Sequence, residues 1–168
     1  RADASRALDL LLKQMPNAPR APNTAMLPLL GGDISDFTAL RNRAQLSRPA
    51  YVSARSLDAL LRNHGTEYTQ VLALAADHVA DRERIQNTDT LLAEVTYAVC
   101  HEMAVHLEDV ALRRTDMASG SHPGIRALDM AATRMQQLLG WTDRRRMEEV
   151  AQTEAALRRR HAVPPAAA

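Results

Sequence analysis

The chain has 168 residues, a length that suits one domain with a modest core. Its 21 basic and 20 acidic residues leave a net charge of +1, which argues against a nucleic-acid-binding protein because such proteins carry a large basic excess. Only 3% of the residues are aromatic, so leucine, alanine, valine and methionine must fill the core. The single cysteine, Cys100, excludes an internal disulfide, and no run reaches the roughly 18 apolar residues of a membrane span.

The first elements expected along the chain are a helix and a linker. Leucines and alanines share one side of residues 2–14, which predicts a helix that Pro16 ends. Four prolines then fall between Met15 and Asp33, a density typical of an extended segment. We therefore expect a domain boundary in this linker.

Three elements are expected between this linker and residue 90. A short helix with Asp33 or Ser35 as its N-cap carries Phe37 and ends at Ser47. Ser53 is the expected N-cap of a second helix, which a glycine closes. A third helix has Thr66 as its expected N-cap, and its inward residues are Tyr68, Val71, Leu72, Ala75 and Val79. The polar residues 81–89 predict a loop.

The stretch from Ala93 to Thr115 is expected to form one long helix or a helical hairpin, with a break near residues 100–102. Apolar residues recur there every three or four positions on one face: Leu92, Val95, Val99, Met103, Leu107 and Val110. Asp109 precedes Arg113 by four residues, a spacing that supports an ion pair of roughly 0.2–0.5 kcal/mol. Cys100 lies within this amphipathic run, so we expect a buried, unreactive thiol.

Two helices are expected in the last third of the chain. Apolar residues step by three and four from Ile125 to Leu139, and Gly140 ends that helix. Trp141 is expected to anchor the corner, and Thr142 or Asp143 to start the final helix. No stretch shows the alternation of apolar and polar residues that is typical of a β-strand. The sequence thus predicts an all-α fold, a compact bundle of about six to seven helices with an N-terminal helix and a Pro-rich linker before the main helical domain.

Two histidines raise the question of a metal site. His101-Glu102 followed by His106 approaches the His-Glu-x-x-His zinc motif, but that motif needs histidines four residues apart and here they are five apart. We expect surface or packing histidines and predict no metal ligand.

The charged residues allow two interpretations. Five of them could form one polar cluster that contacts a flavin domain or a substrate phosphate: Glu94, Glu102, Asp109, Arg113 and Arg114. The alternative, which we favour, is a set of salt bridges within the domain that tie two helices together. The arginine runs 144–146 and 158–160 could likewise touch phosphates or lipid head groups, but a solvated helix face is the favoured interpretation.

Several short motifs together resemble a known family. They are Glu94-Val95-x-Tyr97, Glu102-x-Ala104, Leu107-x-Asp109 and Arg113-Arg114-Thr115, and in this order they resemble the signature of the C-terminal domain of FAD-dependent glycerol-3-phosphate dehydrogenases. Further similar segments are Leu29-Leu30-Gly31-Gly32, residues 60–65, Leu139-Gly140-Trp141 and Glu148-Glu149-Val150. The sequence departs from the family at His64, where a tyrosine is common before Gly65, so a contact of that ring with the linker is in doubt.

The resemblance implies a larger parent enzyme. That parent oxidises glycerol 3-phosphate to dihydroxyacetone phosphate with FAD as cofactor and passes electrons to quinone. Its flavin domain precedes this region, and Arg1 is expected to be the last residue of a Gly-Gly-Lys-x-Thr-Thr-Tyr-Arg segment. Residues 1–14 then form a helix trailing from the flavin domain, 15–34 the linker, 35–160 the C-terminal helical cap domain and 161–168 a disordered tail.

The resemblance also implies where the parent works and what it meets. We expect a cytoplasmic protein, peripheral on the inner face of the cytoplasmic membrane, with its own flavin domain and a second copy in a homodimer as candidate partners. The present sequence has no Gly-x-Gly-x-x-Gly turn, so we expect no catalytic, cofactor-binding or metal-binding residue in it. Two alternatives stay open: the same domain of a glycerol-3-phosphate oxidase, and a free-standing helical interaction module.

Overall fold

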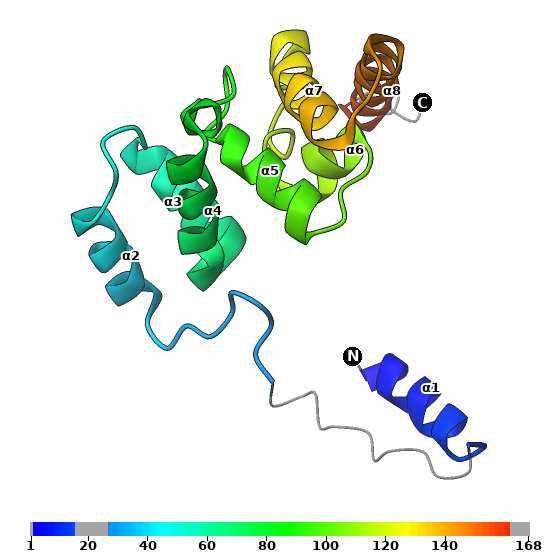
Figure 1. Cartoon of the computed structure of the whole chain (residues 1–168). Coiled ribbons are helices and arrows are strands. Elements are labelled where there is room, and N and C mark those ends of the chain that lie inside the picture. Colours follow the sequence, from blue (N-terminus) through cyan, green and yellow to red (C-terminus); the bar gives the residue numbers. More distant parts are fainter. Residues whose placement is uncertain (1, 16–26, 162–168) are drawn as a thin grey trace, which may run out of the picture.

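The computed structural model describes residues 2–15 and 27–161, and its regular elements there are helices, apart from one isolated antiparallel bridge between Arg84 and Leu91 (Figure 1). The all-α prediction is confirmed. The longer helices are α1 (Ala2–Leu12), α2 (Phe37–Leu46), α3 (Ala54–His64), α4 (Tyr68–Asp77), α5 (Leu92–His101), α7 (Ile125–Leu139) and α8 (Asp143–His161). The short ones are η2 (Gly65–Glu67), η3 (Val79–Arg82), α6 (Leu107–Asp109) and the π-helical η4 (Val110–Arg114).

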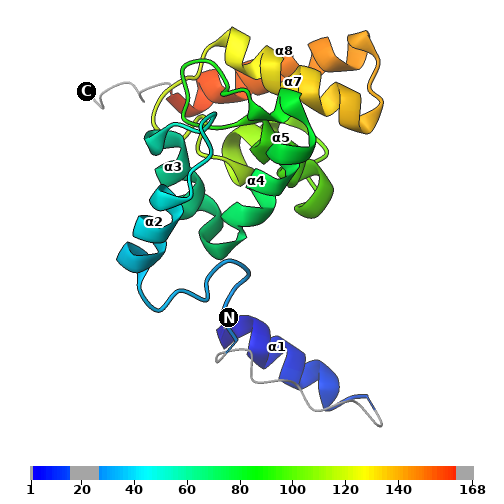
Figure 2. The same ribbon diagram turned by 60° about the vertical axis from the view of Figure 1, so that its left-hand side comes forward.

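Helix α5 lies between the group α2–α4 and the pair α7 and α8 (Figures 1 and 2). Its residues belong to two hydrophobic cores, one on each side. Leu92 and Val95 pack into the core shared with α7 and α8, whereas Ala93 and Tyr97 pack into the core shared with α2, α3 and α4. Residues 92–98 are consequently all buried. A helix that is buried on every side explains why this part of the signature is apolar almost throughout.

The helix ends follow the predicted capping residues in part. Ser53 accepts a hydrogen bond from the Ser56 backbone N–H, and Gly65 and Gly140 close α3 and α7 with positive φ angles, as expected. The N-cap of α2 is Asp36, so the prediction of Asp33 or Ser35 was wrong; the helix begins later, at Phe37.

Two further details of the helix predictions differ from the structure, and one agrees with it. Thr66 caps no helix, because η2 runs directly into α4 without a side-chain cap. Val79 is exposed rather than inward, since α4 ends at Asp77. Trp141 is half-buried against the α5–α7–α8 core, which agrees with its predicted corner position.

The signature region is two helical pieces with a break at residues 102–106. Helix α5 ends at His101, and Cys100 in its last turn is exposed; the prediction of a buried thiol was wrong. Met103 was expected on the apolar face, but it lies in the break with φ 56° and is 84% exposed. A break of several residues shifts the helical phase, so a periodic face cannot continue across it.

The N-terminal part is described only in pieces. No residue of α1 is buried among the described residues, and its leucines Leu8, Leu10 and Leu11 are exposed. The predictions for Arg1, for the prolines at 16, 19 and 22, and for most of the 161–168 tail lie outside the described residues. No helix in the described ranges is long and apolar enough to cross a membrane.

Candidate functional site

The motif residues form two separate polar groups. We call the first the entry contact: Gly31, His64, Gly65, Glu94 and Tyr97. We call the second the α6 cluster: His106, Glu108, Asp109, Arg113, Arg145 and Glu149. The first group includes residues near the start of the stretch 93–115, and the second includes residues near its end. The two groups differ in burial and in the parts of the chain that they hold together.

The entry contact begins with two glycines whose backbones touch. A Cβ atom on Gly65 would lie 1.9 Å from the Gly31 carbonyl oxygen, and one on Gly31 would lie 2.3 Å from the His64 carbonyl oxygen. Both residues have positive φ angles, and the Thr66 N–H donates a 3.0 Å hydrogen bond to the Gly31 carbonyl. Only glycine fits at either position, so the two glycine-containing motifs hold the segment that enters the helical domain against the end of α3.

Next to the glycines lies a buried His–Glu pair. His64 Nε2 is 3.3 Å from Glu94 Oε2, and Glu94 Oε1 accepts a 2.8 Å hydrogen bond from the Leu91 backbone N–H at the start of α5. Burial raises the pKa of the Glu94 carboxyl, and the neighbouring His64 opposes that shift. The His64 ring also packs edge-on against Tyr97, with centroids 5.3 Å apart. The His64 ring therefore packs against Glu94 and Tyr97 inside the domain, while its backbone carbonyl meets Gly31 of the entering segment.

Sequence reasoning missed a second buried carboxylate. Asp81, expected in a polar loop, is fully buried and pairs with Arg134 of α7 at 2.7 Å. The Thr96 hydroxyl donates to the same carboxylate at 3.0 Å. The group joins η3, α5 and α7 through residues far apart in the sequence, and no local pattern could have indicated it.

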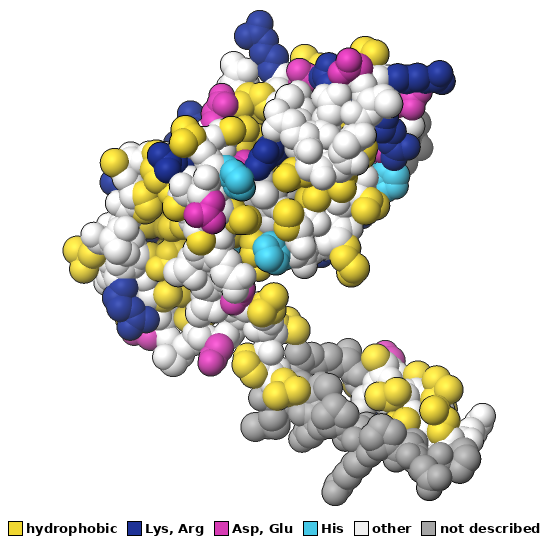
Figure 3. Space-filling view, in the orientation of Figure 1, with side chains coloured by type: hydrophobic (Ala, Val, Ile, Leu, Met, Phe, Trp, Pro, Cys, Tyr) yellow, Lys and Arg dark blue, Asp and Glu magenta, His cyan; other side chains and the backbone are white. Residues whose placement is uncertain are grey.

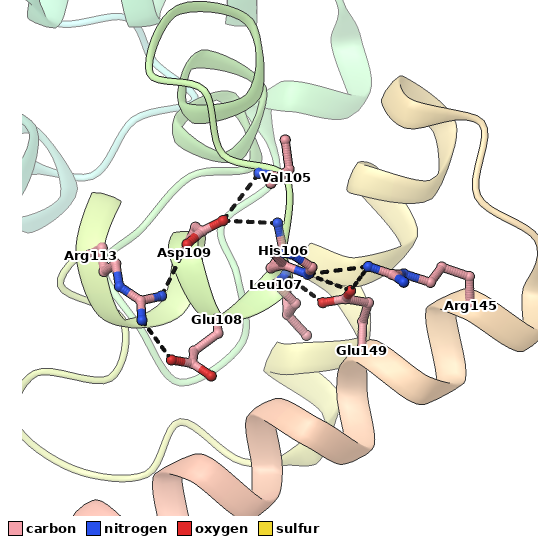
Figure 4. Close-up of polar contacts among 8 residues, drawn as sticks. All are labelled: Val105, His106, Leu107, Glu108, Asp109, Arg113, Arg145 and Glu149. Atoms are coloured by element: carbon pink, nitrogen blue, oxygen red, sulfur yellow. Dashed lines mark hydrogen bonds and ion pairs between the residues drawn. The ribbon is translucent and has the colours of Figure 1, made fainter.

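The α6 cluster starts from Asp109, which closes the first turn of α6 (Figure 4). Its Oδ2 accepts hydrogen bonds from the backbone N–H groups of Val105 and His106 at 3.2 and 2.9 Å. Arg113 then contacts Asp109 at 3.0 Å and Glu108 at 2.8 Å, which confirms the predicted 109–113 pair. The backbone hydrogen bonds are among the causes that lower the pKa of Asp109, although its partial burial acts in the opposite direction.

Glu149 of α8 completes this cluster from the other side (Figure 4). It accepts a 2.9 Å hydrogen bond from the Leu107 backbone N–H, lies 2.9 Å from His106 Nδ1 and pairs with Arg145. The carboxylate is nearly fully buried, so these contacts tie α6 to α8. The motif Glu148-Glu149-Val150 marked this position, but its partners on α6 lie about forty residues away and could not be read from it.

The surface beside the α6 cluster is hollowed, with a cavity of about 320 Å³. Three carboxylates line it or reach it, and each is already paired with Arg113 or Arg145. Paired charges leave little excess field for an ionic ligand. The contacts of Glu149 with the Leu107 N–H and with Arg145 hold α6 against α8.

The five-residue polar cluster considered from the sequence does not form. Glu94 is buried in the entry contact, whereas Asp109 and Arg113 belong to the α6 cluster. His101 stacks on Tyr97, while His106 contacts Glu149, so the two histidines have different neighbours. No group of three His, Cys, Asp or Glu residues within the described ranges could hold a metal ion.

The arginine runs are paired along helix surfaces. Arg144 contacts Glu148, Arg146 contacts Asp129, and Arg158 contacts Glu154. These pairs agree with the favoured interpretation of a solvated helix face.

Gly31-Gly32 does not form a dinucleotide-binding glycine turn. Such a turn joins a strand to a helix N-terminus, and the described ranges contain no strand of that kind. The one double glycine, Gly31-Gly32, is packed on Gly65 and leads into Asp33–Asp36 rather than directly into a helix.

The chain's elements and its two hydrophobic cores define a helical domain. The family model described as the C-terminal domain of alpha-glycerophosphate oxidase matches residues 22–146, well over half of the chain. The chain belongs to this family, and is the C-terminal helical domain of an oxidoreductase of the glycerophosphate oxidase and dehydrogenase type. No curated protein and no solved structure matches the chain.

Proposed function

We propose that the chain is the helical cap of an FAD-dependent glycerol-3-phosphate dehydrogenase. The parent oxidises glycerol 3-phosphate to dihydroxyacetone phosphate, and bound FAD accepts the hydride and passes the electrons to quinone. Residues 1–14 belong to the flavin domain as its trailing helix, 15–34 are the linker and 35–160 the cap domain. The cap contributes no catalytic group, and the parent works at the inner face of the cytoplasmic membrane.

The proposal rests on one observation: the residues of the family motifs contact other parts of this domain and hold them in place. The glycines of two motifs hold the entering segment, Glu94 and Tyr97 pack around His64, and Asp109 and Arg113 hold α6. Each residue supports the position of a helix or of the incoming chain, as expected of a domain that supports a catalytic neighbour. The family match supports the same relation to an oxidoreductase.

The proposal is tested on the full-length gene product. Purified protein should contain FAD and should reduce a quinone analogue when glycerol 3-phosphate is added. Fast transfer of the electrons to oxygen, with hydrogen peroxide as product, would favour the oxidase alternative. A product without flavin, encoded by a frame that starts near Arg1, would contradict the proposal and favour a free-standing helical module.

A further inference from the structure

We propose that one face of this domain is the surface on which the parent's own flavin domain docks. We call it the docking face: Leu29, Leu30, Glu67, His101, Glu102 and Met103. The inference rests on the proposed function and adds the residues that make the contact. Three observations carry it: a strained apolar residue held out to solvent, the continuity of the face with the chain entry, and two partly exposed carboxylates beside the apolar residues.

The strained residue is Met103. It has a left-handed backbone with φ 56° and its side chain is 84% exposed. Non-glycine residues avoid this conformation unless neighbouring contacts impose it. Here the contacts are local: the Glu102 and Ala104 N–H groups both bond to the Ala98 carbonyl, and Asp109 holds the Val105 N–H. The fold thus presents a large apolar side chain on a fixed loop, an arrangement that suits an anchor for a partner.

The face is continuous with the point where the chain enters the domain. A Cβ atom on Gly31 would lie 3.5 Å from the Glu67 side chain, and Glu67 and Glu102 both act on the Tyr97 phenol, whose pKa is raised mainly by burial. Tyr97 in turn stacks on His101, with ring centroids 4.8 Å apart. Exposed Leu29 and Leu30 precede Gly31 directly. Figure 3 shows apolar side chains gathered where this entering segment meets the helical body.

This continuity identifies the occupant. The family is that of a C-terminal domain, so the catalytic neighbour is joined through the segment before Leu29. A neighbour joined at that point has a high effective concentration at surfaces beside it. The docking face adjoins the entry, whereas the apolar groove lined by Ile125, Met130 and Val150 lies on α7 and α8.

The third observation concerns the charge of the face. Glu67 and Glu102 are both partly exposed, so the face carries two carboxylates beside its apolar residues. The flavin domain is therefore expected to place an arginine or lysine against them, beside an apolar pocket for Met103.

The test compares hydrogen exchange in the 168-residue chain with that in the full-length holoenzyme. Amides of residues 27–32 and 101–105 should exchange roughly tenfold or more slowly in the holoenzyme, while those of α7 and α8 should not change. Equal exchange of the docking face in both proteins overturns the proposal. Protection that grows with the concentration of the 168-residue chain identifies a second copy as the occupant and also overturns it.

A matched pair of variants separates docking from folding. Met103→Asn keeps a residue that tolerates the left-handed backbone but removes the apolar anchor, and Met147→Asn makes the same change on exposed α8. Met103→Asn should leave the unfolding midpoint of the 168-residue chain unchanged and should raise exchange at residues 27–32 of the holoenzyme roughly tenfold. Met147→Asn should not alter that exchange. Equal effects of the two variants on it contradict the proposal.

The outcome also distinguishes this inference from the proposed function. A full-length product that lacks flavin would contradict both the proposed function and the proposal that a flavin domain occupies the docking face. A product that contains flavin and oxidises glycerol 3-phosphate, but shows no protection at the docking face, removes the docking face alone.

Discussion

The entry contact and the α6 cluster come from the same family motifs, yet they hold the molecule in different ways. In the entry contact, two glycine backbones touch and the Glu94 carboxylate is fully buried. In the α6 cluster, Arg113 remains exposed to solvent while it contacts Glu108 and Asp109. Steric fit and burial dominate at the first site, whereas the second combines one buried carboxylate, Glu149, with ion pairs that are open to solvent. Substitutions should therefore be most damaging at the entry contact.

The sharpest test of this contrast is Gly65→Ala. The new Cβ atom meets the Gly31 carbonyl at 1.9 Å and also forces alanine into a positive φ angle. Strain and overpacking each cost about 1–3 kcal/mol, so we expect the free energy of unfolding to fall by about 3 kcal/mol or more. Denaturant unfolding of the 168-residue chain measures the change.

Two other glycines provide controls for that experiment. Gly140 has φ 66° but open space around it, so Gly140→Ala should cost only the backbone strain, about 1 kcal/mol. Gly120 has neither feature, and Gly120→Ala should be nearly neutral. If Gly65→Ala is no worse than Gly140→Ala, the contact between the two glycine backbones does not stabilise the domain.

The next largest effect is expected at Glu149, the buried member of the α6 cluster. Glu149→Ala leaves the Leu107 N–H and the Arg145 guanidinium without their partner, and should cost about 2–3 kcal/mol. The adjacent Glu148→Ala removes only a surface pair with Arg144 and should cost less than about 1 kcal/mol. Similar losses for both variants, measured by thermal unfolding, would mean that α6 is not tied to α8 through this carboxylate.

A smaller effect is expected for Arg113→Ala. Its two ion pairs are open to solvent, so the loss should be about 0.5–1 kcal/mol at low salt. High salt should reduce the difference between variant and wild type, since mobile ions screen exposed pairs. Urea unfolding at two salt concentrations checks this. A loss of stability as large as that of Glu149→Ala would contradict the distinction between exposed and buried charges in this cluster.

The finest distinction is a pH dependence with opposite signs at the two sites. The pKa of Glu94 is raised in the folded state, so the folded state binds this proton up to a higher pH than the unfolded state does. The stability of the wild type relative to Glu94→Gln should therefore fall as pH rises above the ordinary pKa of 4.5. The Asp109 pKa is lowered, so its contribution is present above the ordinary value of 3.8 and is lost as pH falls through the lowered pKa. Unfolding curves of wild type, Glu94→Gln and Asp109→Asn across acidic and neutral pH measure both slopes. A Glu94 difference that grows in favour of wild type with rising pH would contradict the assignment.

The sequence predicted those features that depend on neighbouring residues. The Ser53 cap, the Gly65 and Gly140 stops and the 109–113 ion pair each involve residues within one or two helical turns, and each is present. The all-α class follows from the same short-range periodicity.

Features that depend on distant contacts or on the position of a break were missed or wrong. Asp81 and Arg134 are 53 residues apart, and the buried role of Asp81 has no local signal. Met103 was expected on the apolar face and Cys100 as a buried thiol, but α5 ends at His101 and both residues are exposed. Periodicity gives the face of a helix but not its end when no glycine or proline marks that end.

The most direct test of the central claim is a flavin titration of the purified 168-residue chain beside the full-length gene product. If this domain supports a catalytic neighbour and does no redox chemistry itself, the 168-residue chain should be colourless, bind no FAD and show no glycerol-3-phosphate-dependent reduction of an electron acceptor. The full-length product should contain FAD and be active. Bound FAD or dehydrogenase activity in the 168-residue chain alone would contradict the claim.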